Sequence, residues 1–534
     1  MRRRWLTLLV ALGLGATLGG APAAAQDESV LRVARLADHV NGFHPVQFAT
    51  GNQFQWFNNV FNTLVNVESD SKTVVASLAD TWDVSDDASE YTFHLNTDAK
   101  WHDGEDFTAD DVAFTINWYN QNPDSFANAF LPQWGQIAGA ADVKGTTDPT
   151  PGVEVIDEDT IKLTLAAPNA EFLVRLADMA HMITPEHILK DATAADVEAL
   201  DFSKGTAGAT IGTGPYTLAS FTPDQQVEFA ANPDYFKGAP NIDRVVFTLF
   251  ADPALAIAQL ESGDLDLAFR APPSEFDRLS AIPTLNTISA PNPGIVRIVF
   301  ATEKAPWSSV DVRQAFAYAI NKQAIVDQYY QGRAQVLYNH PGFKVYDDIN
   351  HYDYDPAKAA ELLTSGGYNG ETFKLLYDQG FPDAPAILPL IQADLQAAGI
   401  NVELVNTEGA DAFIALQEDR TKWDGFMAFG GSEALSPDRS EQYYPQAPNL
   451  QSGYTNPRIF ELWAEGRASA DPEVRDAAYH ELAKILNTDL PQLHLYTPDL
   501  VMAASKRLGG GFDIHLNERE TFMDVETWTL EPAG

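Results

Sequence analysis

The residues of this sequence with the greatest capacity for chemistry are carboxylates and histidines, and they form no recognised catalytic pattern. The acids gather in stretches such as Asp83–Asp87 and Asp103–Asp111. Two carboxylates can serve as general acid and base, but stretches of this kind are more typical of a solvated acidic face. His480-Glu481 is followed by Leu, Ala and Lys, so it lacks the second histidine of a zinc-binding HExxH helix. Cysteine is absent, which excludes thiol nucleophiles, disulfides and thiolate metal sites.

Metal binding by histidine has one candidate, near the N-terminus. The eleven histidines are scattered, and His39 and His44 are the closest pair ahead of a plausible pocket. Turn or surface positions explain this pair more simply than metal ligation. The sequence also lacks a GxxxxGK[ST] phosphate loop, a GxSxG elbow and an EF-hand loop. We therefore predict a protein without catalytic residues, metal or cofactor.

Aromatic side chains are the more prominent resource, with 30 Phe, 18 Tyr and 10 Trp. Such rings stack on sugars, on other rings and on extended chains, and each buries about 150–250 Å². The pattern places several of them in loops, namely Phe43, Trp56, Trp101, Trp134, Tyr443 and Tyr444. Core packing is the alternative for any single ring. As a set, they favour a binding site over an active site.

In the N-terminal half, the elements that position these residues are mainly strands. Alternating apolar residues predict strands at 30–34, 91–95, 153–156, 160–165, 216–221, 227–231 and 266–269. Helices are predicted at 53–64, 108–119 and 252–263. Thr108 is suited to cap the second of these, and Asp252-Pro253 and Gly263 are suited to start and stop the third.

From about residue 295, strands and helices alternate regularly. Strands are predicted at 295–301, 372–377, 401–405 and 423–429, and helices at 309–330 (with Asn321 as a possible second cap), 355–365, 384–398, 410–418, 456–469 and 472–487. This alternation predicts an α/β fold with a parallel, doubly wound sheet. Ligands of open α/β sheets bind beyond the carboxyl ends of strands, which selects the loop of Gly430, Gly431, Ser432 and Glu433.

Length and charge limit the classes of protein that fit. A chain of 534 residues is longer than one hydrophobic core usually serves, so two or three domains are expected. The best candidate for an interdomain crossing is the proline-rich stretch from Ala271 to Pro293, and a second crossing is expected near Tyr496-Thr497-Pro498. The formal charge of −41 argues against nucleic acid as a partner, because phosphate contacts need clustered cations.

The N-terminus indicates export. Three arginines at 2–4 precede the almost wholly apolar stretch Trp5–Leu18, and small residues follow at 21–25. This pattern is typical of a secretory signal peptide cleaved before Gln26, with a membrane anchor as the alternative. No cysteine is available at the cleavage site for lipid attachment. We therefore expect a free periplasmic protein.

A series of motifs runs in order along essentially the whole mature chain. They are LADTWDVSDD at 78–87, YTFHL at 91–95, WHDG at 101–104, FTADDV at 107–112, GTGPY at 212–216, NPDYF at 232–236, LESGDLD at 260–266, DVRQAFAYAI at 311–320 and YDPAKA at 354–359. Their order and content closely resemble the family 5 extracellular solute-binding proteins, the peptide/nickel-type binding proteins of ABC importers.

The resemblance implies a two-lobe periplasmic-binding-protein fold of type II, with an extra subdomain in lobe I. It implies a signal peptide at 1–25, lobe I at 26–62, 205–271 and 498–534, an inserted subdomain at 63–204, and lobe II at 272–497. A ligand that contacts both lobes would stabilise the closed form. The membrane permease would then recognise that closed shape.

The resemblance also points to a site. The family's peptide binders usually place a Trp and, three residues later, an Asp that pairs with the amino terminus of the ligand; these positions correspond here to Gly430 and Glu433. Glu433 can still receive a cation, whereas Gly430-Gly431 opens the pocket and exposes backbone groups. We predict a ligand site formed by Phe43, His44, Gln47, Trp134, Gly430, Gly431, Ser432 and Glu433. A capped turn after the first strand is the alternative role for His44 and Gln47.

Together these features predict a monomeric, non-enzymatic, periplasmic solute-binding component of an ABC importer. It would deliver a small molecule to permease and ATPase subunits in the inner membrane. Peptides or amino compounds are the favoured ligands, and oligosaccharides are the alternative, because a glycine-opened loop with aromatic neighbours suits both. A secreted hydrolase of glycans or peptides is a further alternative, and the missing nucleophile and metal motifs weigh against it.

Overall fold

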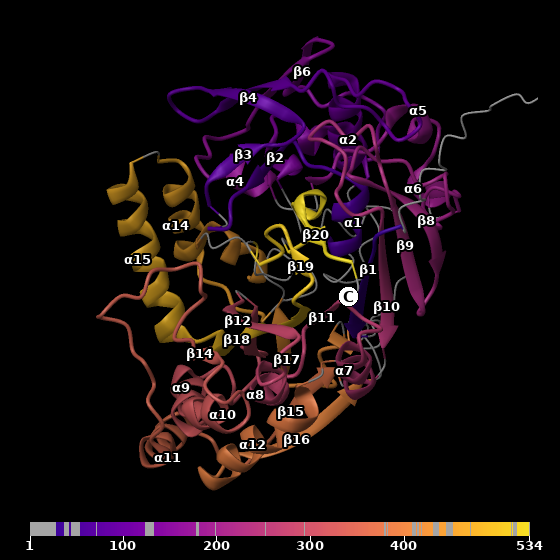
Figure 1. Ribbon diagram of the computed structural model, residues 1–534. Helices are drawn as coiled ribbons and strands as arrows, with labels where there is room; N and C mark the ends of the chain where they lie inside the picture. Colours follow the sequence, from indigo (N-terminus) through magenta and orange to yellow (C-terminus); the bar gives the residue numbers. More distant parts are fainter. Residues whose placement is uncertain are drawn as a thin grey trace, which may run out of the picture.

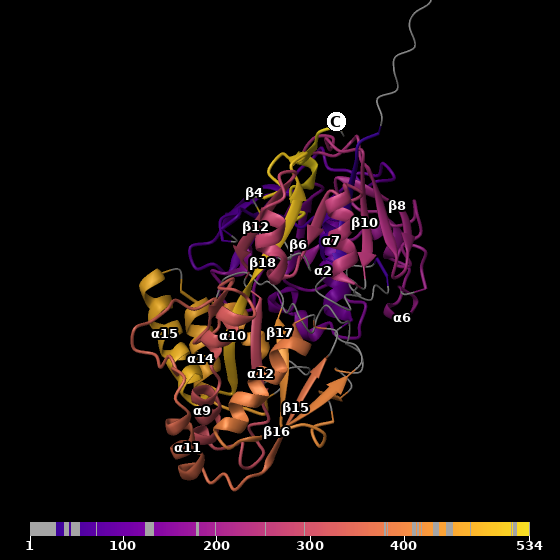
Figure 2. The same cartoon turned by 60° about the horizontal axis from the view of Figure 1, so that its bottom comes forward.

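The computed structural model describes residues 28–532 apart from 37–41, 44–53, 71, 123–132, 178–180, 198, 251, 293, 379–380, 382, 408–412, 414–415, 418, 431–436, 445–451, 470, 514 and 516–520. The described strands form one 12-stranded mixed sheet, a four-stranded sheet and two two-stranded sheets. We call the elements before Asn292 and after Thr497 lobe I, and residues 294–497 lobe II. The lobes occupy opposite ends of the molecule (Figures 1 and 2).

Lobe I combines strands of the large sheet with a smaller α/β layer. Its part of the large sheet contains β1 (Val30–Leu36), β8 (Tyr216–Thr222), β9 (Gln226–Ala231), β10 (Arg244–Phe250), β11 (Leu267–Phe269) and β12 (Leu285–Pro291). Its helices beside these strands are α1 (Phe54–Val60), α7 (Pro253–Ser262), η5 (Pro273–Glu275) and α8 (Phe276–Ser280). The C-terminal pieces are β19 (Leu508–Gly509), η8 (Val525–Thr527) and β20 (Thr529–Leu530).

The smaller layer of lobe I is built from residues 65–197. Its sheet has the order β4-β5-β7-β6, with β4 (Ala79–Val84), β5 (Glu90–Leu95), β7 (Thr160–Thr164) and β6 (Val153–Asp157). Beside it lie the hairpin β2 (Val65–Val67) and β3 (Val74–Ala76) and the helices α2 (Ala109–Gln121), η2 (Trp134–Gln136), η3 (Ala140–Asp142), α4 (Phe172–Leu176), α5 (Glu186–Leu189) and α6 (Ala194–Val197).

Lobe II continues the large sheet and covers it with helices. Its strands are β13 (Ile295–Phe300), β14 (Ala334–Val336), β15 (Thr372–Asp378), β16 (Asn401–Thr407) and β17 (Gly425–Gly430). Its helices are α9 (Val310–Ala319), α10 (Lys322–Gln328), α11 (Pro356–Ser365), α12 (Ala384–Ala397), η6 (Pro437–Tyr443), α14 (Pro457–Arg467) and α15 (Pro472–Asp489). The helix predicted at 410–418 falls largely outside the described residues.

One strand joins the two halves of the large sheet. The 14-residue β18 (Gln492–Ser505) pairs antiparallel with β13 and β14 through its first half. Through its second half it pairs antiparallel with β11 and β12. The partners change between Thr497 and Asp499, where the Thr497 hydroxyl also donates a hydrogen bond to the Asn292 carbonyl oxygen. The two lobes therefore meet where β12, β13 and β18 cross between them.

The predicted boundary between lobes at residues 271 and 272 lies before this crossing. Leu279 on α8 and Leu285 on β12 are buried in the same apolar cluster as Ala34 and Phe250 of lobe I. Because these residues share the core of lobe I, we propose to place the boundary at Asn292.

The sheet of lobe II is mixed, so the prediction of a parallel sheet was wrong. Strand β15 is parallel to β16 and β17, but β13 is antiparallel to β17. The reason is the crossing: β13 carries the chain into lobe II, whereas β17 points back toward lobe I.

Local sequence explains where many helices begin. In α7, α11, α14 and α15 a proline occupies the first turn, where no N–H bond is lost. In each case the side chain of the residue before the proline accepts a hydrogen bond from a backbone N–H of the first turn. These acceptors are Asp252, Asp355, Asn456 and Asp471. Asn321 likewise caps α10, as its position in the sequence predicted.

The WHDG motif fastens the smaller layer of lobe I to the tight turn at 212–214. The Nε2 atom of His102 donates to the carbonyl oxygen of Gly214 (3.0 Å), and the Gly212 N–H donates to Nδ1 (3.2 Å). Burial lowers the pKa of His102 to about 4, so the ring is neutral at pH 7 and can accept at Nδ1. A Cβ at position 212 would lie only 1.8 Å from the Val60 carbonyl oxygen, which explains the glycine.

Candidate ligand-binding site between the lobes

The directions of the strands show which ends face the junction between the lobes. Strand β18 runs from lobe II into lobe I and is antiparallel to β11, which is parallel to β1 and hence to β10. The carboxyl ends of β1, β10 and β11 therefore point toward lobe II, as the arrow of β10 shows in Figure 2. Strands β15, β16 and β17 run parallel to β18, so their carboxyl ends point toward lobe I. The ligand-binding ends of both sets of strands thus face each other.

On the lobe I side, the carboxyl end of β1 carries a buried arginine. Arg35 is 2% exposed, and its guanidinium donates a hydrogen bond to Oε1 of Gln55 on α1. The same guanidinium lies 5.6 Å from the ring centroid of Phe269, which ends β11. Cation–π contact and the amide oxygen together orient the positive charge at this edge.

On the lobe II side, the matching edge carries aromatic rings and a carboxylate. Phe381, beyond the end of β15, stacks on Phe429 of β17 with ring centroids 4.2 Å apart. Asp383, just before α12, accepts hydrogen bonds from the hydroxyls of Tyr329 (2.7 Å) and Tyr330 (2.8 Å). Burial, reinforced by the charge of Asp383, raises the pKa of both tyrosines. The phenols therefore keep their protons at physiological pH and hold the carboxylate in one orientation.

Of the eight predicted site residues, three lie within the described part of the chain. Gly430 ends β17 and pairs with Ile295, which is the first residue of β13 after the crossing. Gly430 therefore lies at the junction between the lobes, at the carboxyl end of β17. His44, Gln47, Gly431, Ser432 and Glu433 lie outside the described residues, and their roles stay predictions.

Phe43 and Trp134 are core residues in this structure. The ring of Phe43 is 0% exposed and packs against the rings of Trp56, Phe57, Phe221 and Phe229. Trp134 is 1% exposed and meets the ring of His181 edge to face at 5.1 Å. A role of either ring in ligand contact stays a prediction.

The other rings expected in loops are also buried where they are described: Trp56, Trp101 and Tyr444 are 1–2% exposed. Sequence reasoning did not select Arg35, Phe381, Asp383 or the two tyrosines that directly follow α10. The strand-end rule that selected Gly430 could have found Arg35, Phe381 and Asp383, because each follows or ends a predicted strand. Nothing local marks Tyr329 and Tyr330.

The described residues offer neither a metal site nor a membrane-spanning helix. Within them, no group of three or more His, Asp or Glu side chains could hold a metal ion. Nor does any helix of this part of the chain combine the length and the apolar character that crossing a membrane requires.

Comparison with known proteins identifies the family. Residues 73–454 match the family model described as bacterial extracellular solute-binding proteins, family 5, middle part. The chain belongs to this family. Family 5 is a family of extracellular solute-binding proteins. The two-lobe fold expected from the motifs is confirmed.

Several relatives of this family 5 protein are named for peptide binding. A Brucella ovis protein, 30% identical over 512 residues (92% of this chain and 88% of the relative), carries the provisional name of ABC transporter peptide-binding protein. Di/tripeptide-binding protein 1 of Pseudomonas aeruginosa is 31% identical, covering 69% of this chain and 70% of that protein. The solved structure of DppA from Helicobacter pylori with the peptide STSA matches with a TM-score of 0.81 at 22% identity, over 95% of this chain and 98% of that chain.

Proposed function

We propose that this family 5 protein is the exported solute-binding component of an ABC importer, and that it captures a short peptide between its lobes. The names of the Brucella and Pseudomonas relatives support both parts of the proposal. The observation in this chain that carries it is the meeting of strand carboxyl ends from both lobes at one junction. Delivery to permease and ATPase subunits and a monomeric state belong to the same proposal.

The charges at the two edges suit an ionised peptide. Arg35 offers a guanidinium on the lobe I side, and Asp383 offers a carboxylate on the lobe II side. A short peptide carries the opposite pair, a terminal carboxylate and a terminal ammonium. Glu433, three residues after the end of β17, is a second candidate for the ammonium. A neutral oligosaccharide carries no charge that could interact with either group, which favours the peptide.

The test uses protein freed of bound solute by unfolding in guanidinium and refolding. Native mass spectrometry after incubation with a mixture of di- and tripeptides should show retained peptide, and a parallel incubation with maltotriose should show none. Acetylating the amino terminus or amidating the carboxyl terminus of the retained peptide should weaken binding at least about tenfold, because each change removes one ion pair. Retention of the glycan with no retained peptide would overturn the proposal.

Asp383→Asn tests the lobe II side of the site. Loss of the negative charge should weaken binding of the retained peptide by about tenfold in isothermal titration calorimetry, since a charge-assisted hydrogen bond becomes a neutral one. The control is Asp327→Asn, an exposed aspartate on α10. Equal affinities for the two variants and the parent protein would exclude Asp383 from the site.

Export and the absence of catalysis are tested separately. The intact mass of protein purified from the periplasm should correspond to a chain that starts at Gln26. Peptides recovered after overnight incubation should be uncleaved. Cleavage products that increase with protein concentration would instead favour the hydrolase alternative.

A further inference from the structure

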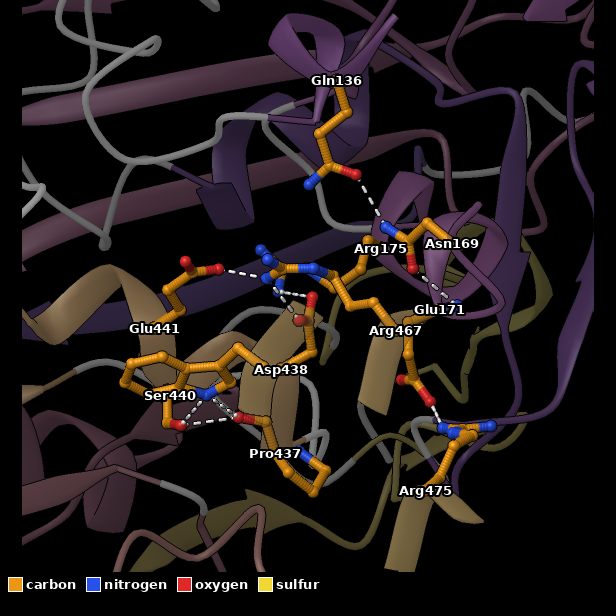
Figure 3. Close-up of polar contacts among 11 residues, drawn as sticks. Gln136, Asn169, Glu171, Arg175, Pro437, Asp438, Ser440, Glu441, Arg467 and Arg475 are labelled. Carbon is orange, nitrogen blue, oxygen red and sulfur yellow. Dashed lines mark hydrogen bonds and ion pairs between the residues drawn. The ribbon is translucent and has the colours of Figure 1, made fainter. Parts of the chain in front are cut away.

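The lobes meet a second time at a cluster of charged side chains away from the crossing strands. The loop before α4 and α4 itself approach η6 and the helix pair α14–α15 of lobe II (Figure 3). In Figures 1 and 2 this helix pair lies to one side of β18. We call the set Glu171, Arg175, Asp438, Glu441, Arg467 and Arg475 the interlobe cluster.

The centre of the interlobe cluster is a buried aspartate shared by arginines of both lobes. Asp438 of η6 is 2% exposed, and its Oδ2 lies 3.5 Å from a terminal nitrogen of Arg175, which is 3% exposed on α4. Its other oxygen, Oδ1, accepts a 2.8 Å hydrogen bond from Arg467 at the end of α14. Arg467 also pairs with Glu441, one turn farther along η6. Lobe I thus contributes a buried cation that pairs with a buried carboxylate of lobe II.

A second ion pair and a backbone bond lie beside this centre. Glu171 of lobe I pairs with Arg475 in the first turn of α15. Between the two pairs, the Ala170 N–H donates to the Arg467 carbonyl oxygen (3.0 Å). Hydrogen bonds within lobe I fix the position of this loop. Oδ1 of Asn169 accepts the Glu171 N–H (2.9 Å), and its Nδ2 donates to Oε1 of Gln136 in η2 (2.7 Å).

The interlobe cluster balances three positive charges with three negative ones in a chain whose formal charge is −41. The cluster needs no ligand to complete these pairs. Removing one partner of a buried pair is strongly unfavourable, because the remaining charge stays buried and uncompensated. Separation of the lobes would break the pairs Arg175–Asp438 and Glu171–Arg475, whereas Arg467 would keep Asp438 and Glu441 as partners within lobe II.

We propose that the interlobe cluster is a latch that keeps the lobes together without ligand. The more the latch stabilises the closed form, the less of the free energy of ligand binding is needed to close the lobes. The latch therefore changes the apparent affinity without contacting the ligand. This inference rests on the proposed function only in requiring lobes that can separate.

The latch is tested in ligand-free protein by charge exchange across the lobes. Spin labels are attached to cysteines introduced at Ile156 of β6 and Val345 of lobe II, which are 52% and 78% exposed. Because the chain has no cysteine of its own, only these two sites are labelled. Pulsed electron paramagnetic resonance then measures the distance between the lobes in the parent protein and in Glu171→Arg, Arg475→Glu and the double exchange.

The parent protein should show mainly the short distance, and each single exchange should shift most of the population to longer distances. The double exchange restores opposite charges and should return at least half of the short-distance population. The matched control is Arg458→Glu, which breaks pairs with Glu461, Glu465 and Glu481 within lobe II and should leave the distance unchanged.

A parent protein that is already open, single exchanges that stay closed, or a control that opens equally would each overturn the latch. The assay uses no ligand, so its outcome is independent of the peptide tests. A failed latch with normal peptide binding leaves the proposed function intact. If the latch is confirmed but no peptide binds, only the proposal of a peptide ligand is overturned.

Discussion

The side chain of Glu526 shows how strongly one position can couple this fold to pH. It is 7% exposed beside β20, and its Oε2 has no hydrogen-bond partner within the described chain. Burial raises the pKa of this carboxyl from 4.5 to about 7. Between these values the unfolded chain releases a proton that the folded chain keeps. The free energy of unfolding therefore falls as pH rises from about 4.5 to 7 and then stays lower by about 3 kcal/mol.

Glu526→Gln removes this ionisation and should change the pH dependence of stability. The melting temperature of the variant relative to the parent should increase between pH 4.5 and 7 and remain constant above pH 7. Differential scanning calorimetry across this range measures it, with the exposed Glu531→Gln as control. A difference between variant and parent that is the same at every pH would contradict the assignment.

At the residue scale, the sequence predicted where a residue lies within a strand or loop better than it predicted which side chains surround that residue. Gly430 was selected because a strand end is a local feature, and it is indeed the last residue of β17; its contact with a ligand stays a prediction. The same reasoning could not tell that Phe43 and Trp134 face the core, because the sequence of a loop does not show in which direction an aromatic side chain points. The partners Arg175 and Asp438 are 263 residues apart, so no local pattern connects them.

At the scale of elements, helix α11 isolates the effect of a single cap. Oδ1 of Asp355 accepts the Lys358 N–H (2.9 Å) and satisfies one of the free donors of the first turn. Asp355→Ala should cost about 1 kcal/mol locally and speed amide exchange across Pro356–Ser365 about fivefold. Asp355→Asn is the control and should stay within about twofold of the parent, since Asn caps equally well. Mass spectrometry measures the amide exchange rates. Equal rates in the Asp355→Ala and Asp355→Asn variants would contradict a capping role of Asp355.

Elements with local signals were the ones that the sequence located well. The predicted helices beginning at Asp-Pro or Asn-Pro match α7, α11, α14 and α15, and the predicted strands match β13, β15, β16 and β17 to within a few residues. Strands β12, β14 and β18 were not predicted, and their pairing partners come from distant parts of the chain. The prediction of a parallel sheet was wrong because β13 pairs antiparallel with β17.

At the scale of the whole molecule, self-repulsion should limit stability at low salt. Removal of the proposed signal peptide would take away the three arginines at 2–4 and leave 31 basic residues against 75 acidic ones, or −44. Screening shortens the range of repulsion from about 30 Å at 0.01 M salt to about 3 Å at 1 M. The melting temperature should therefore rise by several degrees as NaCl increases over this range. Equal concentrations of KCl should have the same effect, and a flat or falling curve would contradict repulsion as the cause.

The crossing at β12 and β18 has one more consequence. Pro291 pairs with Asp499, and Thr497 reaches the Asn292 carbonyl, so the chain enters and leaves lobe II at neighbouring points. Lobe II is therefore one continuous insertion in the chain. A short turn from Asn292 to Asp499 would connect the two parts of lobe I directly. An exchange of residues 294–497 between two proteins of this fold would therefore need new joints at this one place only.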